Sequence, residues 1–390
     1  MVLYKSRNEG TMAGERINFS LVKFISIVCL GLSSCRSSRI DSRISFKKSE
    51  KKMKLKELKF SDLPGWNTDD PSKALEAFQK SCIKIMNEGD FVASSQIVIS
   101  ADFMKNACAA IPETPITKEL AKTYFEYWFA PYKVQTMDNS SKGTITGYYE
   151  TELEGDIRPS CSYLNPIYGK PYDLPLNGEK YLSRSEIENG KLRNKAPVLF
   201  WAKNQSDVIL LHIQGSGVVR TPDGKHYRVG YAGNNGYSFK GIGSILMSHD
   251  IKPDGGYSMT SVKAWLDSHP NQTKKLILEN DRYIFFRDIE GEGPIGAMGV
   301  PLTPERSIAV DPEYIPLGLP LFLETKDADG EKIERTVVAQ DIGAAIKGVI
   351  RADLFWGKGK RAFSKAGRQH STGSYYILLP KEGKNFAVKK

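Results

Sequence analysis

Three short stretches near the C-terminal end decide the fold of this 390-residue chain. They read SIAVDP at 307–312, VAQDIGAAIKG at 338–348 and RADLFWGKG at 351–359. In each stretch an aspartate (Asp311, Asp341 or Asp353) ends or follows an apolar run. A carboxylate at the end of a buried strand is unfavourable unless it is hydrogen-bonded, and neighbouring glycines allow close approach of backbone or substrate. The pattern predicts a functional site; a local turn role for Asp311 and Asp341 is the alternative.

Asp353 differs from the other two aspartates in its neighbours. The apolar residues 354–356 that follow it would raise the pKa of its carboxyl group, as a general acid at neutral pH requires. Arg351 and Lys347 would lower that pKa. The sequence does not decide which effect prevails.

The rest of the chain reads as mainly β with helices. Strand-like runs separated by Gly, Pro and Asn occupy 144–149, 208–213, 320–323, 336–339 and 375–379, a spacing that favours barrels over a doubly wound sheet. Helical patterns occupy 70–89, 117–129, 240–248 and 260–267. Asp70 and Pro71 predict the start of the first helix, and Gly89 its end. At this length the chain has room for two domains.

Several polar residues are candidates for binding a substrate. Gln214 and Ser216 lie among glycines directly after the apolar run 208–213, where their polar groups would be available to a ligand. Tyr148 and Tyr149 would stack on a ligand, unless they fill a core or its rim. The full set of candidates adds residues from three other motifs: Glu150, Tyr231, Asn235 and Lys347. A turn role is the alternative for the two residues of the Gly-rich loop at 230–236.

The order of these motifs resembles a known family. The three aspartates, with GAAIKG between the last two and WGKG after them, look like the three-Asp domain, a double-psi β-barrel. The upstream motifs are GYYE at 147–150, QGSG at 214–217, GYAGNNG at 230–236, FFR at 285–287 and PLTPERS at 301–307. Together they resemble the membrane-bound lytic murein transglycosylase A family over about residues 60 to 382.

The resemblance implies a discontinuous catalytic domain. Residues 60–152 and 288–385 would form a helical and double-psi-barrel unit, and residues 153–287 would form an inserted second β-barrel. The glycan would lie in a groove between the two barrels, where Gln214 and Ser216 would contact its N-acetyl or hydroxyl groups and Tyr148 and Tyr149 would stack on its sugar faces. The resemblance implies a reaction that needs neither a cofactor nor a metal. In agreement with this, the five histidines are dispersed without the spacing of metal ligands.

The resemblance also implies the reaction. The family's catalytic aspartate falls on Asp353, while Asp341 and Asp311 have supporting roles. One carboxyl group protonates the glycosidic oxygen and then removes a proton from the C6 hydroxyl, which closes a 1,6-anhydromuramoyl ring. The expected enzyme is a peptidoglycan lytic exotransglycosylase, although exo and endo action are not distinguished by the sequence. The alternatives are a hydrolytic muramidase using an Asp341/Asp353 pair, and a barrel that binds peptidoglycan without cleaving it.

The N-terminal 60 residues carry most of the net charge. They hold 14 Lys or Arg against 5 Asp or Glu, in a chain whose net charge is +10. The remaining body is close to neutral, which disfavours a nucleic-acid partner. The expected partners are peptidoglycan strands, a membrane, and complexes of cell-wall synthesis or hydrolysis.

The leader has the order of an export signal. Arg16 and Lys23 precede the apolar run 24–32, and small residues follow it. LSSC at 32–35 resembles a lipobox, which predicts a lipid on Cys35 and an outer-membrane anchor in the periplasm. An ordinary cleaved signal and a soluble periplasmic protein are the alternative. Residues 36–59 predict a basic, solvated linker, beginning after the signal at 1–35.

Three cysteines remain outside the leader. Cys82, Cys108 and Cys161 do not have metal-ligand spacing, and their odd number gives no disulfide framework. We expect buried thiols, with a Cys82–Cys108 bridge as the one pairing considered, since export permits disulfides.

Overall fold

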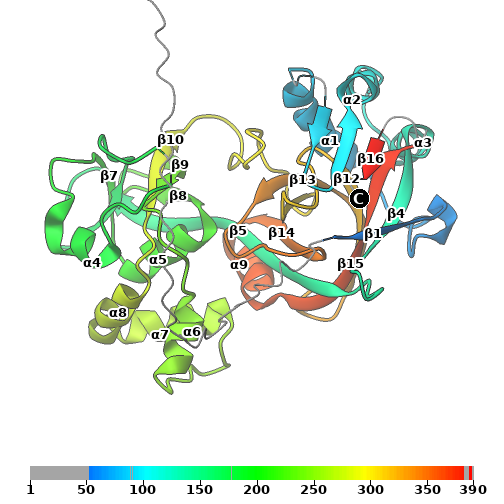
Figure 1. Ribbon diagram of the computed structural model, residues 1–390. Coiled ribbons are helices and arrows are strands. Elements are labelled where there is room, and N and C mark those ends of the chain that lie inside the picture. The colour runs from blue at the N-terminus through cyan, green and yellow to red at the C-terminus, as the bar shows by residue number, and fades with distance from the viewer. Residues whose placement is uncertain (1–51, 88, 90, 177, 382–385, 389–390) are drawn as a thin grey trace, which may run out of the picture. The chain divides into compact units, whose positions relative to one another are not determined.

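The computed structural model describes residues 52–87, 89, 91–176, 178–381 and 386–388 (Figure 1). The predicted leader, Cys35 and most of the predicted linker lie outside these residues. Of the part that is described, no segment forms a helix long and apolar enough to cross a bilayer.

Strands make up the larger part of the regular structure in the described residues, and helices lie at the N-terminal end, within the middle and, as α9, near the C-terminal end. The strands are β1 Lys54–Glu57, β2 Phe91–Ala93, β3 Ile97–Ser100, β4 Phe129–Gln135, β5 Gly143–Asp156, β6 Asn165–Tyr168, β7 Val198–Ala202, β8 Ser216–Arg220, β9 His226–Asn234, β10 Ile284–Ile289, β11 Ser307–Val310, β12 Pro320–Lys326, β13 Lys332–Ile342, β14 Arg351–Lys358, β15 His370–Pro380 and β16 Phe386–Val388. The helices are α1 Ser72–Ile85, α2 Ala101–Ala109, α3 Lys118–Trp128, α4 Arg184–Glu186, α5 Gln205–Gln214, α6 Ile242–Ser248, α7 Met259–Ser268, α8 Pro270–Leu276 and α9 Gly359–Arg368. The prediction of a mainly β chain with helices is confirmed.

Six strands close into a ring that carries the three aspartate motifs. The order is β15, β12, β13, β11, β14 and β5, and β5 pairs back onto β15. Two of the pairings, β11 with β13 and β14 with β5, are parallel, and the others are antiparallel. A closed ring leaves no free edge among its members, which makes it a rigid base for side chains at the strand ends.

Strand β5 continues beyond this ring into a second set of strands (Figure 1). Its residues 151–154 pair in parallel with β8, which is followed in order by β9 and β10. The end of β5 pairs with β7, and β7 pairs with β6. A single bridge from Gly169 to Phe286 links the end of β6 to β10. One fourteen-residue strand therefore belongs to both sets.

The helices pack against the first ring, the second set of strands and one another through separate apolar clusters. Helices α1 and α3 contribute Phe78 and Phe125, both fully buried, to the main core that also holds the strands of the first ring. The second set of strands has a smaller core of its own, and α6, α7 and α8 bury a third cluster against α5. These burials follow from the apolar faces that the sequence repeats at helical spacing.

The run 208–213 was predicted as a strand, and this prediction is wrong. These residues lie in α5, where residues 206–212 are all buried. A short, continuous apolar run does not distinguish a buried strand from a buried helix by its period. Gly215, at φ 78°, ends the helix in the left-handed conformation that glycine adopts without strain.

Three other boundaries or environments differ from the sequence predictions. Lys54–Glu57 form β1 and pair with β4, so ordered structure begins before the predicted end of the linker at residue 59. Helix α1 ends at Ile85, four residues before Gly89. Cys161 is exposed rather than buried. In the first case, backbone pairing to an existing strand compensates for a polar sequence that has no core-forming pattern.

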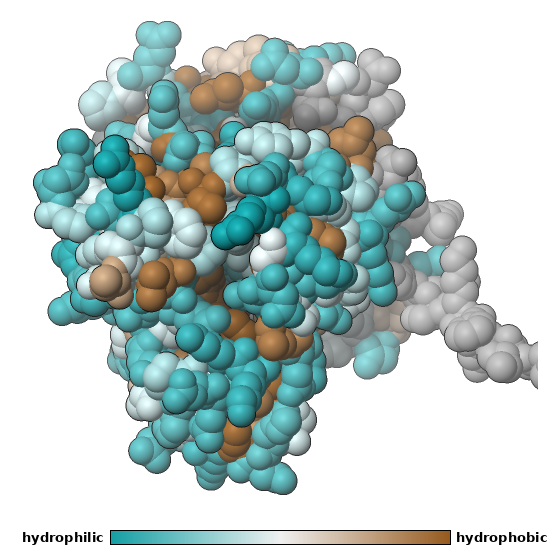
Figure 2. Space-filling model, turned by 90° about the vertical axis from the view of Figure 1, so that its left-hand side faces the viewer, coloured by the Kyte–Doolittle hydropathy of each residue, from teal (hydrophilic) through white to brown (hydrophobic). Residues whose placement is uncertain are grey.

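The face that carries α4 and β7 in Figure 1 is turned toward the viewer in Figure 2. It is mostly hydrophilic, and its apolar residues form small patches separated by polar ones. This distribution is typical of a solvated surface and does not indicate a broad apolar docking area on that face.

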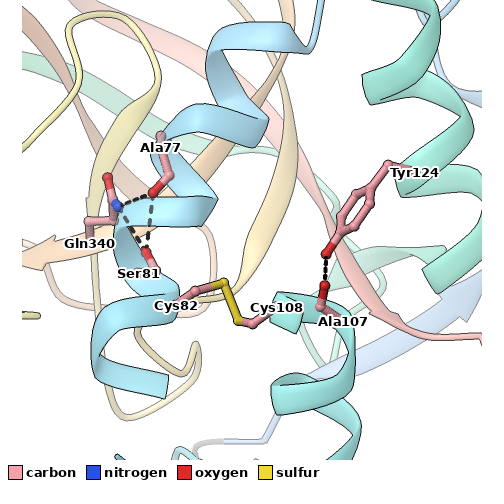
Figure 3. Close-up of a disulfide and its surroundings, with 7 residues drawn as sticks. All are labelled: Ala77, Ser81, Cys82, Ala107, Cys108, Tyr124 and Gln340. Atoms are coloured by element: carbon pink, nitrogen blue, oxygen red, sulfur yellow. Dashed lines mark hydrogen bonds between the residues drawn. A yellow bond between two sulfur atoms is a disulfide. The ribbon is translucent and has the colours of Figure 1, made fainter. Parts of the chain in front are cut away.

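The disulfide considered for Cys82 and Cys108 is present. It joins α1 to α2 across a sequence separation of 26 residues (Figure 3). Close by, the hydroxyl of Tyr124 on α3 donates a hydrogen bond of 2.6 Å to the carbonyl of Ala107 on α2 (Figure 3). The three helices are thus linked to one another near the C-terminal end of α1.

Replacing Cys82 and Cys108 by serine should lower the free energy of unfolding by about 3 kcal/mol, because the cross-link restricts the unfolded chain. Urea denaturation of the double variant would measure the loss. Cys161→Ser, at an exposed and unbridged position, is the control and should change stability by less than about 0.5 kcal/mol. Equal urea midpoints for the two variants would contradict this prediction.

Candidate active site

Strand pairing places Asp353 beside two small neighbours. On β14 it lies opposite Thr146 of the parallel strand β5 and opposite Ala309 of the antiparallel strand β11. Ala309 is also paired with Asp341 on its other side, through β13. The two aspartates therefore flank one buried alanine of the central strand.

The carboxyl group of Asp353 has one hydrogen-bond donor. Thr146 Oγ1 donates to its Oδ1 over 2.7 Å, and within the described residues no group donates to its Oδ2. Burial raises the pKa of Asp353 to about 6, and the negative charge of Asp341 acts in the same direction. The Thr146 hydrogen bond and the positive charge of Arg351 lower the pKa, but burial prevails. Asp353 thus keeps a proton to a higher pH than an ordinary aspartate and has one oxygen free to deliver it.

The apolar surroundings of Asp353 come from fewer residues than the sequence indicated. Phe355, two places along β14, packs its ring 5.2 Å from that of Tyr148. Both belong to a small buried cluster that also includes Ala309. Leu354 and Trp356 instead join the main core, since alternate residues of a strand point to opposite faces.

Asp341 has a full set of donors, in contrast to Asp353. The backbone N–H groups of Ala297 and Ile342 donate to its Oδ1, each over 2.9 Å. The hydroxyl of Tyr148 donates to its Oδ2 over 3.0 Å. Burial raises the pKa of Asp341, and these three hydrogen bonds lower it. Both oxygens are occupied, so Asp341 holds its surroundings in place more readily than it transfers a proton.

Asp311 lies in the same motif set but bonds to a different segment. The residue is buried, and its side chain accepts hydrogen bonds from the backbone N–H groups of Gly348 and Glu313. Lys347, whose side chain is 61% exposed, reaches it over 3.4 Å. These contacts fix the loop that leads into β14. Only the bond from Glu313, two residues along the chain, is of the local turn type that was the alternative for Asp311, because Gly348 is 37 residues away.

The GYYE motif is held close to the core by its glycine. A Cβ atom at Gly147 would lie 2.6 Å from Trp356 Nε1, which is closer than such atoms approach one another. Trp356 is in turn fixed by donating to Gln369 Oε1 over 2.6 Å. The glycine thus lets β5 pass against the indole, with Thr146 and Tyr148 on either side.

The second tyrosine and Gln214 meet in the fold. Gln214, the last residue of α5, accepts a hydrogen bond from the backbone N–H of Tyr149 over 3.0 Å. The ring of Tyr149 packs 5.3 Å from Phe363 of α9. Tyr149 is 5% exposed, so it lies in the core or its rim, as the alternative considered.

The remaining binding candidates lie at the end of the first ring, for Glu150, or in and beside the second set of strands. Glu150 is 1% exposed and accepts a hydrogen bond from Arg228 Nε over 2.6 Å. Asn235 is fully buried and bonds to the backbone at Leu182, Asp281 and Tyr283, so its polar atoms are used within the fold. Ser216 is also buried, at the start of β8, whereas Tyr231 is 48% exposed. Of these four residues, Tyr231 is the one whose side chain is exposed to solvent.

Family models and known proteins match the chain in the regions just described. A model described as the MltA specific insert domain matches residues 144–287, and one described as the 3D domain matches residues 306–379. The structure of MltA from Neisseria gonorrhoeae is 32% identical with a TM-score of 0.73, covering 84% of this chain and 93% of that one. The lytic transglycosylase LtgG of Burkholderia pseudomallei is 35% identical with a TM-score of 0.59, covering 84% and 96%.

Among curated sequences, membrane-bound lytic murein transglycosylase A of Escherichia coli K12 is 29% identical over 260 residues. This alignment covers 65% of this chain and 70% of the relative. The chain belongs to the MltA family. Membership makes it a peptidoglycan-degrading lyase with the two-domain fold of lytic transglycosylases.

The sequence did not identify Thr146 as a residue that contacts Asp353 directly. Thr146 precedes the GYYE motif and was quoted only as part of a strand-like run. It also accepts a hydrogen bond from Arg351 Nη2 over 2.9 Å, which links that cation to Asp353. The pairing of β5 with β14 brings these residues together across more than 200 positions, so no local signal could identify them.

Thr146→Val should move the alkaline limb of the pH–activity profile to higher pH. The change removes a hydrogen bond that lowers the pKa of Asp353, so the protonated acid persists to higher pH. In the unmodified enzyme, kcat/KM should fall about tenfold per pH unit above the pKa of Asp353, about 6. Thr144→Val, two residues earlier on β5, is the matched control and should leave the limb in place. If the limb is unchanged or moves to lower pH in Thr146→Val, the titrating acid is not Asp353 held by Thr146.

Proposed function

We propose that Asp353 is the single acid and base of a lytic transglycosylase. The carboxyl group donates its proton to the oxygen of the β-1,4 bond between N-acetylmuramic acid and N-acetylglucosamine. As the C1–O bond breaks, the carboxylate removes the proton of the C6 hydroxyl of the same muramoyl residue, and O6 bonds to C1. The products are a 1,6-anhydromuramoyl end and a free 4-hydroxyl on N-acetylglucosamine, with no water consumed.

The contrast between the two aspartates is the observation that supports this proposal. Asp353 has a raised pKa of about 6 and an oxygen without a donor, as an acid that must later act as a base requires. Asp341 has three donors on its two oxygens. A hydrolytic pair needs a second carboxylate able to activate water or attack carbon, and Asp341 is committed to other contacts.

The proposed supporting roles follow from the contacts of the other residues. Asp341 fixes Tyr148 and, through its charge, helps to keep Asp353 protonated. Asp311 and Lys347 hold the loop before β14. Tyr231, which is exposed, remains a proposed sugar contact, whereas Asn235 and Glu150 are assigned to holding the strands together.

We propose the same domain division that the motifs indicated. Residues 60–152 with 288–385 form the catalytic unit, and residues 153–287 form the inserted unit, with peptidoglycan strands as the substrate bound between them. The support is that β5 leaves the first ring after Glu150 and pairs with β8 from Thr151 onward. The relatives' names refer to murein, which is consistent with this substrate.

Asp353→Asn should reduce the rate of anhydromuropeptide formation by about 10²–10⁴-fold, the usual effect of removing a general acid–base group. Purified murein is incubated with each protein, and the products are analysed by mass. Asp341→Asn is the informative comparison, because it keeps the shape of the side chain and should cause a smaller loss. Products with reducing ends, heavier by one water, would identify a muramidase instead, and no products from the unmodified protein would favour a binding module.

We propose that Cys35 carries a lipid that anchors the protein to the outer membrane. The support is the LSSC sequence at 32–35 together with the names of the relatives, which describe them as membrane-bound. Mass analysis of the mature N-terminus should find a lipid-modified cysteine at residue 35, and Cys35→Ala should release the protein from the membrane fraction. An unmodified N-terminus at another residue would overturn the anchor without affecting the proposed reaction.

A further inference from the structure

A β-bulge separates Gln340 from the regular pairing of β13. In the parallel pair of β11 and β13, Ile308 lies opposite Ala339, but the next residue, Ala309, lies opposite Asp341. Gln340 is therefore an extra residue without a partner on β11. Without the bulge, Gln340 would occupy the position beside Ala309, and Asp341 would be displaced by one place. Since a shift of one residue reverses the face to which side chains point, the bulge decides where the Asp341 carboxyl lies.

The side chain of Gln340 is anchored to helix α1. Its amide nitrogen donates to the carbonyl of Ala77 over 2.7 Å and to Ser81 Oγ over 2.8 Å (Figure 3). Its amide oxygen accepts a hydrogen bond from Ser307 Oγ over 2.5 Å. The residue is fully buried, and its two donors and its acceptor are all used.

Helix α1 is itself held at the point where Gln340 contacts it. Cys82 directly follows Ser81 and is bonded to Cys108 of α2 (Figure 3). Helix α2 is in turn linked to α3 through the hydrogen bond from Tyr124 to Ala107. The anchor for the bulge is therefore a covalently cross-linked pair of helices rather than a mobile surface.

The backbone of Gln340 also supports the loop that binds Asp341. Its carbonyl accepts a hydrogen bond from Met298 N–H over 3.1 Å, next to the Ala297 N–H that donates to Asp341. At Gly296, a Cβ atom would lie 2.5 Å from the Gln340 carbonyl oxygen, so the loop passes directly against the bulge. Displacing Gln340 would thus disturb both Asp341 and one of its donors.

We propose that Gln340 is a positioning residue: its amide, anchored to α1, holds the bulge that places Asp341 across Ala309 from Asp353. The inference rests on the proposed function, in which the charge of Asp341 acts on the acid–base group. A purely structural role would affect stability only, whereas a positioning role also affects the protonation of Asp353 and the rate of the chemical step.

Gln340→Met keeps the length of the side chain but removes its donors and its acceptor. If the bulge then relaxes and Asp341 moves away, Asp353 loses a charge that raises its pKa, so the alkaline limb of the pH–activity profile moves to lower pH. The expected result is this shift together with a tenfold or greater fall in kcat at nearly constant KM. Formation of anhydromuropeptides from purified murein, followed across pH, is the measurement.

Two further variants keep the test decisive. Ser81→Ala removes one hydrogen-bond partner of Gln340 and should move the limb in the same direction by a smaller amount, even if Gln340→Met folds poorly. Asn235→Ala removes a fully buried amide in the second set of strands and should lower stability without moving the limb. If the limb and kcat of Gln340→Met and Ser81→Ala match those of the unmodified enzyme, the positioning role is wrong.

Asp353→Asn separates this result from the proposed function. If that variant still forms anhydromuropeptides at the normal rate, the proposed function fails and no effect of Gln340 on Asp353 remains to be explained. If that variant is inactive and the limb in Gln340→Met is unmoved, the positioning role alone is overturned.

Discussion

Strand β14 lies between β5 and β11, and this placement fixes the contacts of Asp353. The parallel register with β5 puts Thr146 beside its carboxyl group, and the antiparallel register with β11 puts Ala309 on its other side. Because the ring closes through β5 and β15, neither neighbour can slip without breaking a ladder of backbone hydrogen bonds. The site is built from strands, which hold side chains more firmly than loops do.

Electrostatics then distinguish two carboxyl groups in one apolar setting. Burial raises the pKa of both Asp341 and Asp353, but the number of donors differs. Three hydrogen bonds hold Asp341 in place, whereas Asp353 has one and keeps an open oxygen. Placing two titratable groups in different hydrogen-bond environments is how a site obtains different roles from the same residue type.

In the part of the chain that the structure describes, the strand pairing between the two sets runs through β5. Strand β5 contributes Thr146 and Tyr148 to the site and then pairs with β8 at the start of the inserted unit. Its neighbour Gln214, at the end of α5, binds the backbone of Tyr149. Any movement of the inserted strands along β5 is therefore restrained close to Asp353.

The sequence determined much of the result because its signals are local. Glycine and proline positions and apolar periodicity were sufficient for the mainly β class and for helices α1, α3, α6 and α7. The family came from the resemblance of the three aspartate motifs and the upstream motifs to known sequences. The run 208–213 was misassigned because a fully buried helix lacks a polar face to reveal its period.

Only the tertiary structure decided how the aspartates differ. The donor from Thr146, the bulge at Gln340 and the anchor on α1 join residues far apart in sequence, through strand registers that no local pattern encodes. The same holds for the apolar wall, since strand alternation leaves Phe355 near Asp353 and sends Trp356 into the main core. The sequence singled out the three aspartates as candidates; the closed ring decided the hydrogen bonds and burial that set the pKa values of Asp341 and Asp353.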